Sequence, residues 1–154
     1  MLTFKHRFMV NTPVNAVKDF HSKSASMRAI TPPPIIVQMH DAPEILTDGS
    51  LMEFTLWFGP LPIRWKAKIE NMTAEGFTDR QLKGPFKSWH HRHSFVAADR
   101  SSTEVLDTVE LQFSSNPLFR LIGWFMWLSL PILFAYRGWV TKRLLKKSYG
   151  IDAV

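Results

Sequence analysis

The chain has 154 residues, a formal net charge of +6 and no cysteine. This length suits one domain with its own hydrophobic core, so we expect a single domain over residues 1–154. The lack of cysteine excludes disulfide frameworks and thiolate metal sites. The positive charge permits anionic partners without identifying one. The first ten residues have no continuous apolar run, so we predict no secretory signal and a cytoplasmic location.

The hydrophobic periodicity predicts an α+β protein in which most strands follow two short helices. We expect a first strand at residues 3–10, short helices at 14–21 and 25–30, and further strands at 35–40, 51–58, 63–71, 77–82, 87–97 and 103–113. Thr12 is the expected N-cap of the first helix and Pro13 its first residue. Strand 63–71 alternates apolar and charged residues, which is typical of an antiparallel sheet with one buried face.

A long helix is expected to follow the last strand. Asn116 and Pro117 predict its start, and Gly150 predicts its end near residue 149. Pro131 interrupts the pattern, so we expect a kink there. Such a helix can cover the concave face of a curved sheet, and a cavity remains wherever it does not fill the curve.

The middle of this helix contains an uncharged stretch at residues 121–136, bounded by Arg120 and Arg137. Sixteen residues at about 1.5 Å each reach about 24 Å, whereas a bilayer core is about 30 Å thick. We therefore expect a helix buried against the sheet. A membrane-inserted segment, extended by the flanking apolar residues, is the alternative.

Two neighbouring parts of the predicted sheet carry the most informative motif. It consists of Phe77, Asp79, Gln81, Gly84, Pro85, Phe86, Trp89, His91, His93, Phe95, Thr103, Val105 and Asp107. Side chains of a strand alternate between two faces, so this period of two places aromatic rings, imidazoles and carboxylates on one face. Polar groups are costly to bury without partners, so this face suggests a cavity wall with a few placed polar groups.

The element order and this motif resemble the helix-grip fold of the START-like (SRPBCC) superfamily, which includes birch-pollen allergens, polyketide cyclases and coenzyme Q-binding proteins. The motif, together with Phe134, Tyr136 and Arg137 in the last helix, is similar to a bacterial ligand-binding, cyclase/dehydrase-like branch. The resemblance covers nearly the whole chain. It implies a curved antiparallel sheet of six to seven strands wrapped around the long C-terminal helix, with two short helices after the first strand.

The resemblance also implies a hydrophobic cavity, although the fold does not name its ligand. We predict that the chain binds a hydrophobic small molecule, such as a lipid, a quinone or a polyketide-like compound. The predicted ligand-binding residues are Phe54, Trp65, Asp79, Gln81, Trp89, His91, His93, Asp107 and Tyr136. The last helix departs from the family pattern in its aromatic residues, which would fill part of such a cavity: Trp124, Phe125, Trp127 and Phe134.

Three alternatives use the same polar residues. In the first, they form an internal hydrogen-bond network that only fixes strand register. In the second, they serve a cyclase/dehydrase-type enzyme, with His91 or His93 as base, Asp107 orienting it and Tyr136 as donor to an enolate. In the third, they bind a metal through His91 and His93, with Asp107 or His40 as third ligand. The sequence has no nucleophile elbow, phosphate loop or cofactor fingerprint, so no catalytic residue, metal or cofactor is predicted.

The end of the last helix is basic: Arg137, Lys142, Arg143, Lys146 and Lys147. This segment suits an ordinary solvated face or peripheral contact with an anionic membrane. A membrane-tethered interaction protein is a third class of function. Nucleic acid is not an expected partner, because the exposed basic strand face with Arg64, Lys66 and Lys68 carries no aromatic residues in the same phase.

Overall fold

The computed structural model describes residues 1–149 and has the predicted α+β architecture. The elements in chain order are β1 (Leu2–Val10), α1 (Val14–Ser22), α2 (Ser24–Ala29), β2 (Ile36–Asp41), β3 (Leu51–Phe58), β4 (Leu61–Thr73), β5 (Gly76–Lys83), β6 (Phe86–Ala97), β7 (Thr103–Phe113) and α3 (Pro117–Tyr149). The strands form one seven-stranded antiparallel sheet in the order β1-β7-β6-β5-β4-β3-β2.

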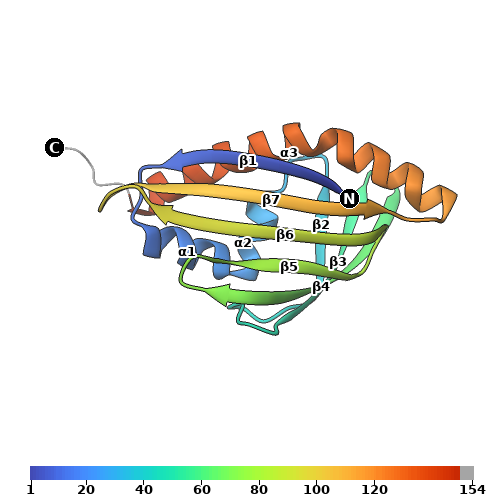
Figure 1. Cartoon of the computed structure of the whole chain (residues 1–154), viewed down its shortest axis with the longest axis horizontal. Helices are drawn as coiled ribbons and strands as arrows, with labels where there is room; N and C mark the ends of the chain where they lie inside the picture. The colour runs from blue at the N-terminus through green and yellow to red at the C-terminus, as the bar shows by residue number, and fades with distance from the viewer. Residues whose placement is uncertain (150–154) are drawn as a thin grey trace.

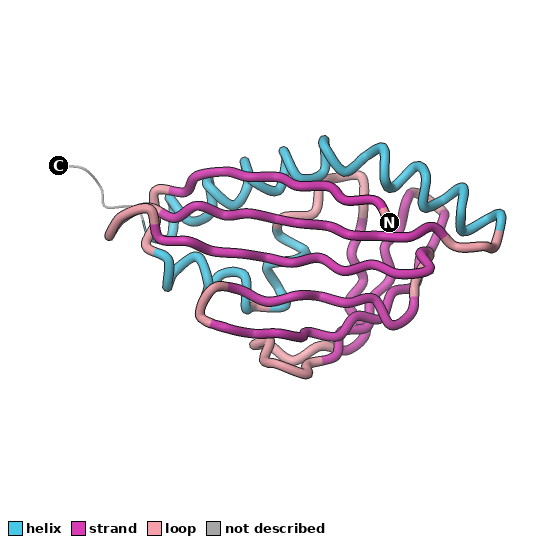
Figure 2. The backbone as a smooth tube through the Cα atoms, in the orientation of Figure 1, coloured by secondary structure: helices cyan, strands magenta, loops and turns pink. Residues whose placement is uncertain are grey.

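The sheet is strongly curved, and the helices lie on one side of it. Along the sheet the strands turn from nearly horizontal in β7 to steep in β2 and β3 (Figure 2). The last helix runs along the β1 side, where it contacts β1, β7 and β6, and its first turns extend past the ends of the strands (Figure 1). The short helix α1 contacts β6 and α3. This arrangement encloses an interior between the sheet, the two short helices and α3.

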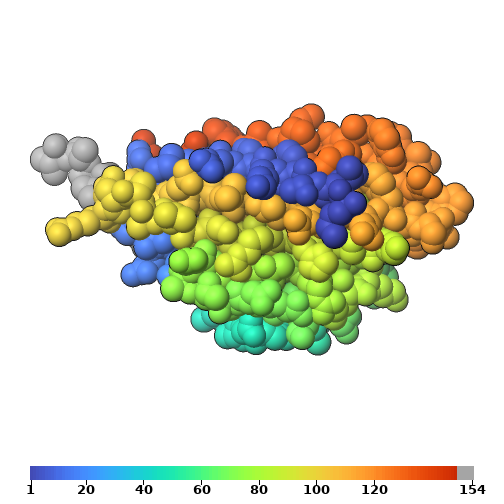
Figure 3. Space-filling view, viewed as in Figure 1, coloured from blue at the N-terminus to red at the C-terminus, as the bar shows by residue number. Residues whose placement is uncertain are grey.

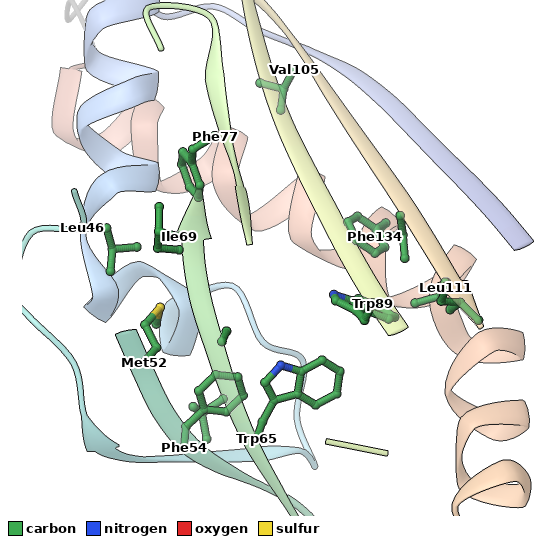
Figure 4. Close-up of a cluster of buried hydrophobic side chains, with 14 of the residues drawn as sticks. Leu46, Met52, Phe54, Trp65, Ile69, Phe77, Trp89, Val105, Leu111 and Phe134 are labelled. Carbon is green, nitrogen blue, oxygen red and sulfur yellow. The ribbon is translucent and has the colours of Figure 1, made fainter. Parts of the chain in front are cut away.

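The apolar phase of the strands forms the core. Figure 4 shows side chains from β3, β4, β5, β6 and β7 facing the same interior as Phe134 of α3. Trp65 packs edge-on against Trp89 at 5.5 Å between ring centroids, and it stacks on Phe54 at 6.2 Å. Val105 and Val109 on β7 are completely buried. The alternation seen in the sequence therefore predicts which face of each strand is buried.

The observed elements differ from the predicted ones by a few residues at most, with one instructive error at the start of α1. The helix begins at Val14, and Pro13 occupies the N-cap position with extended backbone angles and no side-chain cap hydrogen bond. Thr12 does not cap the helix. Its side chain is buried, and its backbone carbonyl accepts a hydrogen bond from Thr103 Oγ1 at 2.7 Å, which ties this residue to β7. The α3 helix is continuous across Pro131. The predicted end at Gly150 lies outside the described residues.

The long helix is buried on one face only, so the expectation of a buried helix is half correct. Leu130, Phe134 and Leu145 are almost completely buried against the sheet. The opposite face exposes large apolar side chains to solvent: Leu118, Leu121, Trp124, Phe125, Leu128, Ile132 and Trp139. The sequence did not distinguish these faces because the helix is apolar all round. The first half of α3 forms an outer edge of the molecule (Figure 3, orange).

Candidate functional site

A cavity of about 150 Å³ lies between the curved sheet, α2 and α3. Most of its wall is apolar, with side chains from β3, β4 and α3 such as Met52, Phe54, Trp65, Leu130 and Leu133. An apolar cavity of about 150 Å³ in another protein holds benzene, whereas typical ligand pockets measure about 300–1,000 Å³. The interior therefore accommodates one aromatic ring or a short aliphatic chain without rearrangement.

The aromatic residues of α3 do not fill this cavity. Trp124 and Phe125 are exposed on the outer face of the helix. Phe134 is buried beside the imidazole of His91, with ring centroids 5.2 Å apart, and it is not part of the cavity wall. Trp127 packs edge-on against Phe4 at 6.5 Å. These aromatic residues therefore lie on the outer surface and the β1 side, and a void remains.

The polar part of the wall is built by three adjacent strands. Asp79 on β5 pairs in register with His91 on β6, and His93 pairs with Asp107 on β7. The two carboxylates thus flank the two imidazoles from opposite sides. We call these four residues the His–Asp cluster. Residues directly opposite or diagonal on neighbouring strands lie within reach of one another, so the strand register alone brings this cluster together.

Both nitrogens of each imidazole lie near a carboxylate. His91 Nε2 is hydrogen-bonded to Asp107 Oδ1 at 3.0 Å, and His91 Nδ1 lies 3.2 Å from Asp79 Oδ2. His93 Nε2 is hydrogen-bonded to the same Asp79 oxygen at 3.4 Å. His93 Nδ1 lies 3.1 Å from Asp107 Oδ1, but the direction of this contact does not fit a hydrogen bond. The two rings are only 3.9 Å apart.

These contacts set the charges of the cluster. Burial raises the pKa of Asp79 and of Asp107, but the contacts with His91 and His93 outweigh burial and hold both pKa values well below the usual range. Burial lowers the pKa of His93, but the two carboxylates outweigh it and raise this pKa to about 9. At neutral pH the cluster therefore combines two carboxylates with an imidazolium at His93.

A third histidine reaches the cavity from α1. Burial, followed by the nearby charge of His93, lowers the pKa of His21 to about 4, so its ring is neutral at neutral pH. Nδ1 of His21 lies 2.8 Å from the carbonyl oxygen of Val17, which can only accept, so Nδ1 carries the proton. The other ring nitrogen is then a free acceptor. The ring centroid of His21 lies 6.0 Å from that of His93.

Arg137 brings a cation to the opposite wall. It lies on α3 and lines the cavity, and its guanidinium carbon is 5.3 Å from the centroid of the Phe134 ring. Its Nε is buried without a hydrogen-bond partner. Burial lowers the pKa of Arg137, and the charges of Asp107 and Asp79 oppose this effect.

The structure brings most of the predicted ligand-binding residues to the cavity. Six of them line it: Phe54, Trp65, Asp79, Trp89, His91 and His93. Asp107 lies behind the histidines and contacts the cavity only through them.

Besides Asp107, two predicted residues lie outside the cavity wall. The amide of Gln81 donates to the Phe86 carbonyl at 2.8 Å and thereby closes the β5–β6 turn. Tyr136 packs against Trp139 on the side of α3. Both side chains thus have other structural contacts, and we do not include them in the site.

Sequence reasoning missed His21 and Arg137 as site residues. His21 lies in a helix with no polar motif around it, and only the path of α1 beneath β6 brings it to the cavity. Arg137 was grouped with the basic end of the helix. Its spacing of seven residues from Leu130, which is buried, was the available signal that Arg137 faces inward.

One part of the cluster has the geometry of a metal site. Asp79, His91 and His93 each offer a ligand atom, and these atoms lie within 4.8 Å of one another. The third ligand would thus be Asp79 rather than Asp107 or His40. His40 is hydrogen-bonded to Thr55 Oγ1 at 2.8 Å, away from this group. These three residues are one carboxylate and two imidazoles, a donor set that zinc accepts with an open fourth position.

Comparisons with known proteins give structural matches only. No protein-family model and no curated protein sequence matches the chain. The Zhui aromatase/cyclase from Streptomyces sp. R1128 superposes with a TM-score of 0.75 at 11% identity, covering 99% of this chain and 98% of its own. A norcoclaurine synthase from Thalictrum flavum, solved with a transition-state analogue, gives 0.68 at 15% identity, covering 97% and 96%.

A third structure shows a higher identity over a small part of a longer chain. It is a nucleoside-diphosphate sugar epimerase from Corynebacterium glutamicum, with 28% identity and a TM-score of 0.65. The match covers 95% of this chain and 29% of the epimerase chain. These likenesses show that the fold is shared across proteins of different stated activities.

Proposed function

We propose that this chain, which has the helix-grip fold of the START-like superfamily, binds a compact hydrophobic small molecule in the cavity between the sheet and α3. The observation that carries the proposal is a void of about 150 Å³ with a largely apolar wall, on which Asp79, His91, His93, His21 and Arg137 place polar groups. Removal of apolar surface from water supplies about 25 cal/mol per Å². The polar groups then orient one end of the molecule.

The volume supports a ligand with about one ring or a short chain. Larger lipids, quinones or polyketide-like compounds require the cavity to open beyond its present volume. The wall between α2 and β2 is the place where a mouth would enlarge, because Met27, Ile30 and Ile35 line the cavity there and Ile35 is partly exposed. A ligand larger than a ring therefore predicts a conformational change in this wall.

A cavity-filling variant tests the proposal directly. Ala67 is buried and lines the cavity, so Ala67→Leu removes part of the void, whereas Ala135→Leu makes the same change on the exposed side of α3. Toluene and p-cresol are suitable probes, with binding followed by calorimetry and by ligand-observed NMR. We expect Ala67→Leu to weaken binding at least tenfold and Ala135→Leu to leave it unchanged. Equal binding by a folded Ala67→Leu protein, together with native mass spectra that contain no copurified ligand, would contradict the proposal.

The His–Asp cluster also supports a second candidate, a cyclase/dehydrase-type enzyme. His93 carries a proton at neutral pH and lines the cavity beside Asp79, as a general acid requires. In this case turnover of a β-hydroxy carbonyl compound is lost in His93→Gln while binding of p-cresol persists. Loss of both together indicates a binding role for the histidine.

For location and partners, we propose a cytoplasmic protein that makes peripheral contact with an anionic membrane through the outer face of α3. Residues 117–148 form a helix that is long and apolar enough to cross a membrane. Only 17% of its most apolar 18-residue stretch is buried in the molecule. Phe125 is 67% exposed and Ile132 is 76% exposed. Exposed apolar patches of this kind mark interaction sites.

Charge favours an anionic bilayer as the occupant of this face. Arg120 precedes the apolar stretch, and the exposed Lys142, Arg143 and Lys146 follow it along the same helix. Each basic residue near an anionic surface adds about 1 kcal/mol. Spanning the bilayer is disfavoured, because Leu130 and Phe134 on the inner face would have to leave the sheet. The helix therefore suits a position in the plane of the interface.

Vesicle sedimentation tests the membrane contact. We expect binding to vesicles of phosphatidylglycerol and phosphatidylcholine, weaker binding to pure phosphatidylcholine, and release by high salt. The double variant Phe125→Ser/Ile132→Ser should lose binding, whereas a Leu51→Ser control on β3 exchanges another exposed apolar residue and should retain it. A dimer in light scattering that the double variant abolishes, without vesicle binding, would instead assign this face to a second copy of the chain.

A further inference from the structure

Arg137 differs from the other arginines whose contacts are known in this fold. Arg80 donates two hydrogen bonds to the carboxylate of Glu70 at 2.8 and 2.9 Å, and Arg92 donates to the Asn71 carbonyl at 2.9 Å. Arg137 makes no hydrogen bond or ion pair with any residue in the described range 1–149, and its Nε is cut off from solvent. Its contact with protein is the face of the Phe134 ring at 5.3 Å.

An arginine in this position keeps its charge and lacks acceptors. The guanidinium carries five N–H donors and is not deprotonated in proteins. Arg137 as a whole is partly exposed, but its Nε is buried, and a buried donor without a partner is costly because buried polar groups are normally paired. Asp79 and Asp107 act on Arg137 only through space, and His91 and His93 contact one oxygen of each of these carboxylates.

We propose that Arg137 is the anchor for a carboxylate on the ligand, so that the bound molecule is a compact amphiphile with one acidic end and an apolar ring or short chain. This inference rests on the proposed function, because it needs a ligand in the cavity. A carboxylate accepts two parallel N–H bonds from a guanidinium, which a hydroxyl or a ketone does not match. The apolar body then lies against Leu130 and Leu133, on the same face of α3 as Arg137.

The other charges of the wall restrict the head group to a single negative charge. The carboxylate of Asp79 also lines the cavity, so it opposes any negative charge on the ligand that Arg137 does not balance. A phosphate or a dicarboxylate would add a second negative charge beside Asp79 in a cavity of about 150 Å³. Lys23 also lines the cavity, but its ammonium forms an ion pair with Asp19, with Nζ 2.8 Å from Oδ2. A monocarboxylate is therefore the class that suits these groups.

Three probes that differ only in the head group test this inference: 3-phenylpropanoate, 3-phenylpropanol and 3-phenylpropylamine, with affinities measured by calorimetry near neutral pH. We expect the carboxylate to bind at least tenfold more tightly than the alcohol, which corresponds to about 1.4 kcal/mol. The amine should bind more weakly than the alcohol. In Arg137→Met, which keeps an apolar stem, the carboxylate should lose its tenfold advantage while the affinity for the alcohol changes less than twofold.

Two further variants keep the test interpretable. Lys142→Met removes an exposed cation from the same helix and should change none of the affinities. Arg137→Lys keeps a charge and should retain part of the preference, and it replaces Arg137→Met if the latter does not fold. Equal binding of carboxylate and alcohol in the unmodified protein, or a preference that survives in Arg137→Met, would overturn the inference and leave the cavity proposal intact. Binding of none of the three probes would overturn both for ligands of this size.

Discussion

The inner and outer faces of α3 have similar composition and very different surroundings. On the inner face, Leu130 and Phe134 are about 1% exposed and pack against the sheet. On the outer face, Phe125 and Ile132 are equally apolar but 67% and 76% exposed. The helix thus serves as core on one side and as free surface on the other. The comparison teaches that burial in this fold depends on which way a helical residue points from the sheet, and that residue type along α3 carries little information about it.

The difference also assigns different tasks to the two faces. The inner face forms part of the cavity through Met126, Leu130, Leu133 and Arg137. A change there alters folding or ligand binding. On the outer face, Trp124 stacks on Phe113 of β7, whereas Phe125 and Ile132 are more than half exposed and add little to the core. A change there should alter only what the protein binds from outside.

The largest expected effect is the loss of the inner aromatic ring. Phe134 contacts the rings of Phe4, His6 and His91, so we expect Phe134→Ala to reduce the free energy of unfolding by about 3–5 kcal/mol. The matched change on the outer face, Phe125→Ala, should reduce it by less than about 0.5 kcal/mol. Urea unfolding of both variants measures the difference. Similar losses for the two variants would show that the faces are not distinct in the way described.

The sequence predicted the fold well because its signals are local and mutually consistent. Period-two alternation predicts the strands, and the pair Asp48-Gly49 is typical of a turn; Gly49 has a positive φ of 86° there. Asn116 predicted the start of α3, and its side chain does accept hydrogen bonds from the first backbone N–H groups of the helix. The outer face of α3 was not predictable, because an apolar helix suits both a core and a membrane surface.

The site was predictable only where one strand phase carried it. His91, His93 and Asp79 share a phase and meet in the structure. Phase gives the face of the sheet but not the distance along it, so Gln81 shares the phase of the cluster and yet lies at the β5–β6 turn, outside the cavity wall. Arg137 comes from an element far away in the sequence. Nothing in the local pattern relates it to β6.

The next effect is expected in the His–Asp cluster. Asp107 is the more buried carboxylate, with a side chain 8% exposed against 24% for Asp79. Asp107→Asn removes a charge that pairs with both imidazoles, and breaking a buried pair costs about 3 kcal/mol. Asp79→Asn should cost less because water reaches that site. Thermal and urea unfolding near neutral pH measure both variants, and a larger loss for Asp79→Asn would contradict this order.

The pH dependence of stability follows from the same contacts. The pKa of His93 rises from 6.5 to about 9 on folding, so its stabilisation is complete below pH 6.5 and is lost as the pH rises through 9. The pKa values of Asp79 and Asp107 fall below 3.8 on folding, so their stabilisation is present above that pH and is lost as the pH falls further. Each pH unit between the two values of His93 corresponds to about 1.4 kcal/mol at most.

NMR titration of the histidine side chains tests this prediction. We expect His93 to titrate near pH 9 and His21 near pH 4. In Asp107→Asn the pKa of His93 should fall, and the loss of stability between pH 6.5 and 9 should become smaller. A His93 that titrates near 6.5 in the unmodified protein would show that the carboxylates do not hold its proton.

The smallest effect is expected on the outer face of α3. Ile132 is 76% exposed, so Ile132→Gln should change the free energy of unfolding by less than about 0.5 kcal/mol. Unfolding measured at two protein concentrations also tests whether a second copy of the chain covers this face. If a second copy covers the face in solution, the unmodified protein will be more stable at the higher concentration, and Ile132→Gln will remove that dependence. If stability is independent of concentration in both proteins, the face is free in solution and available to a membrane surface, and the two faces of α3 then differ in function as they do in burial.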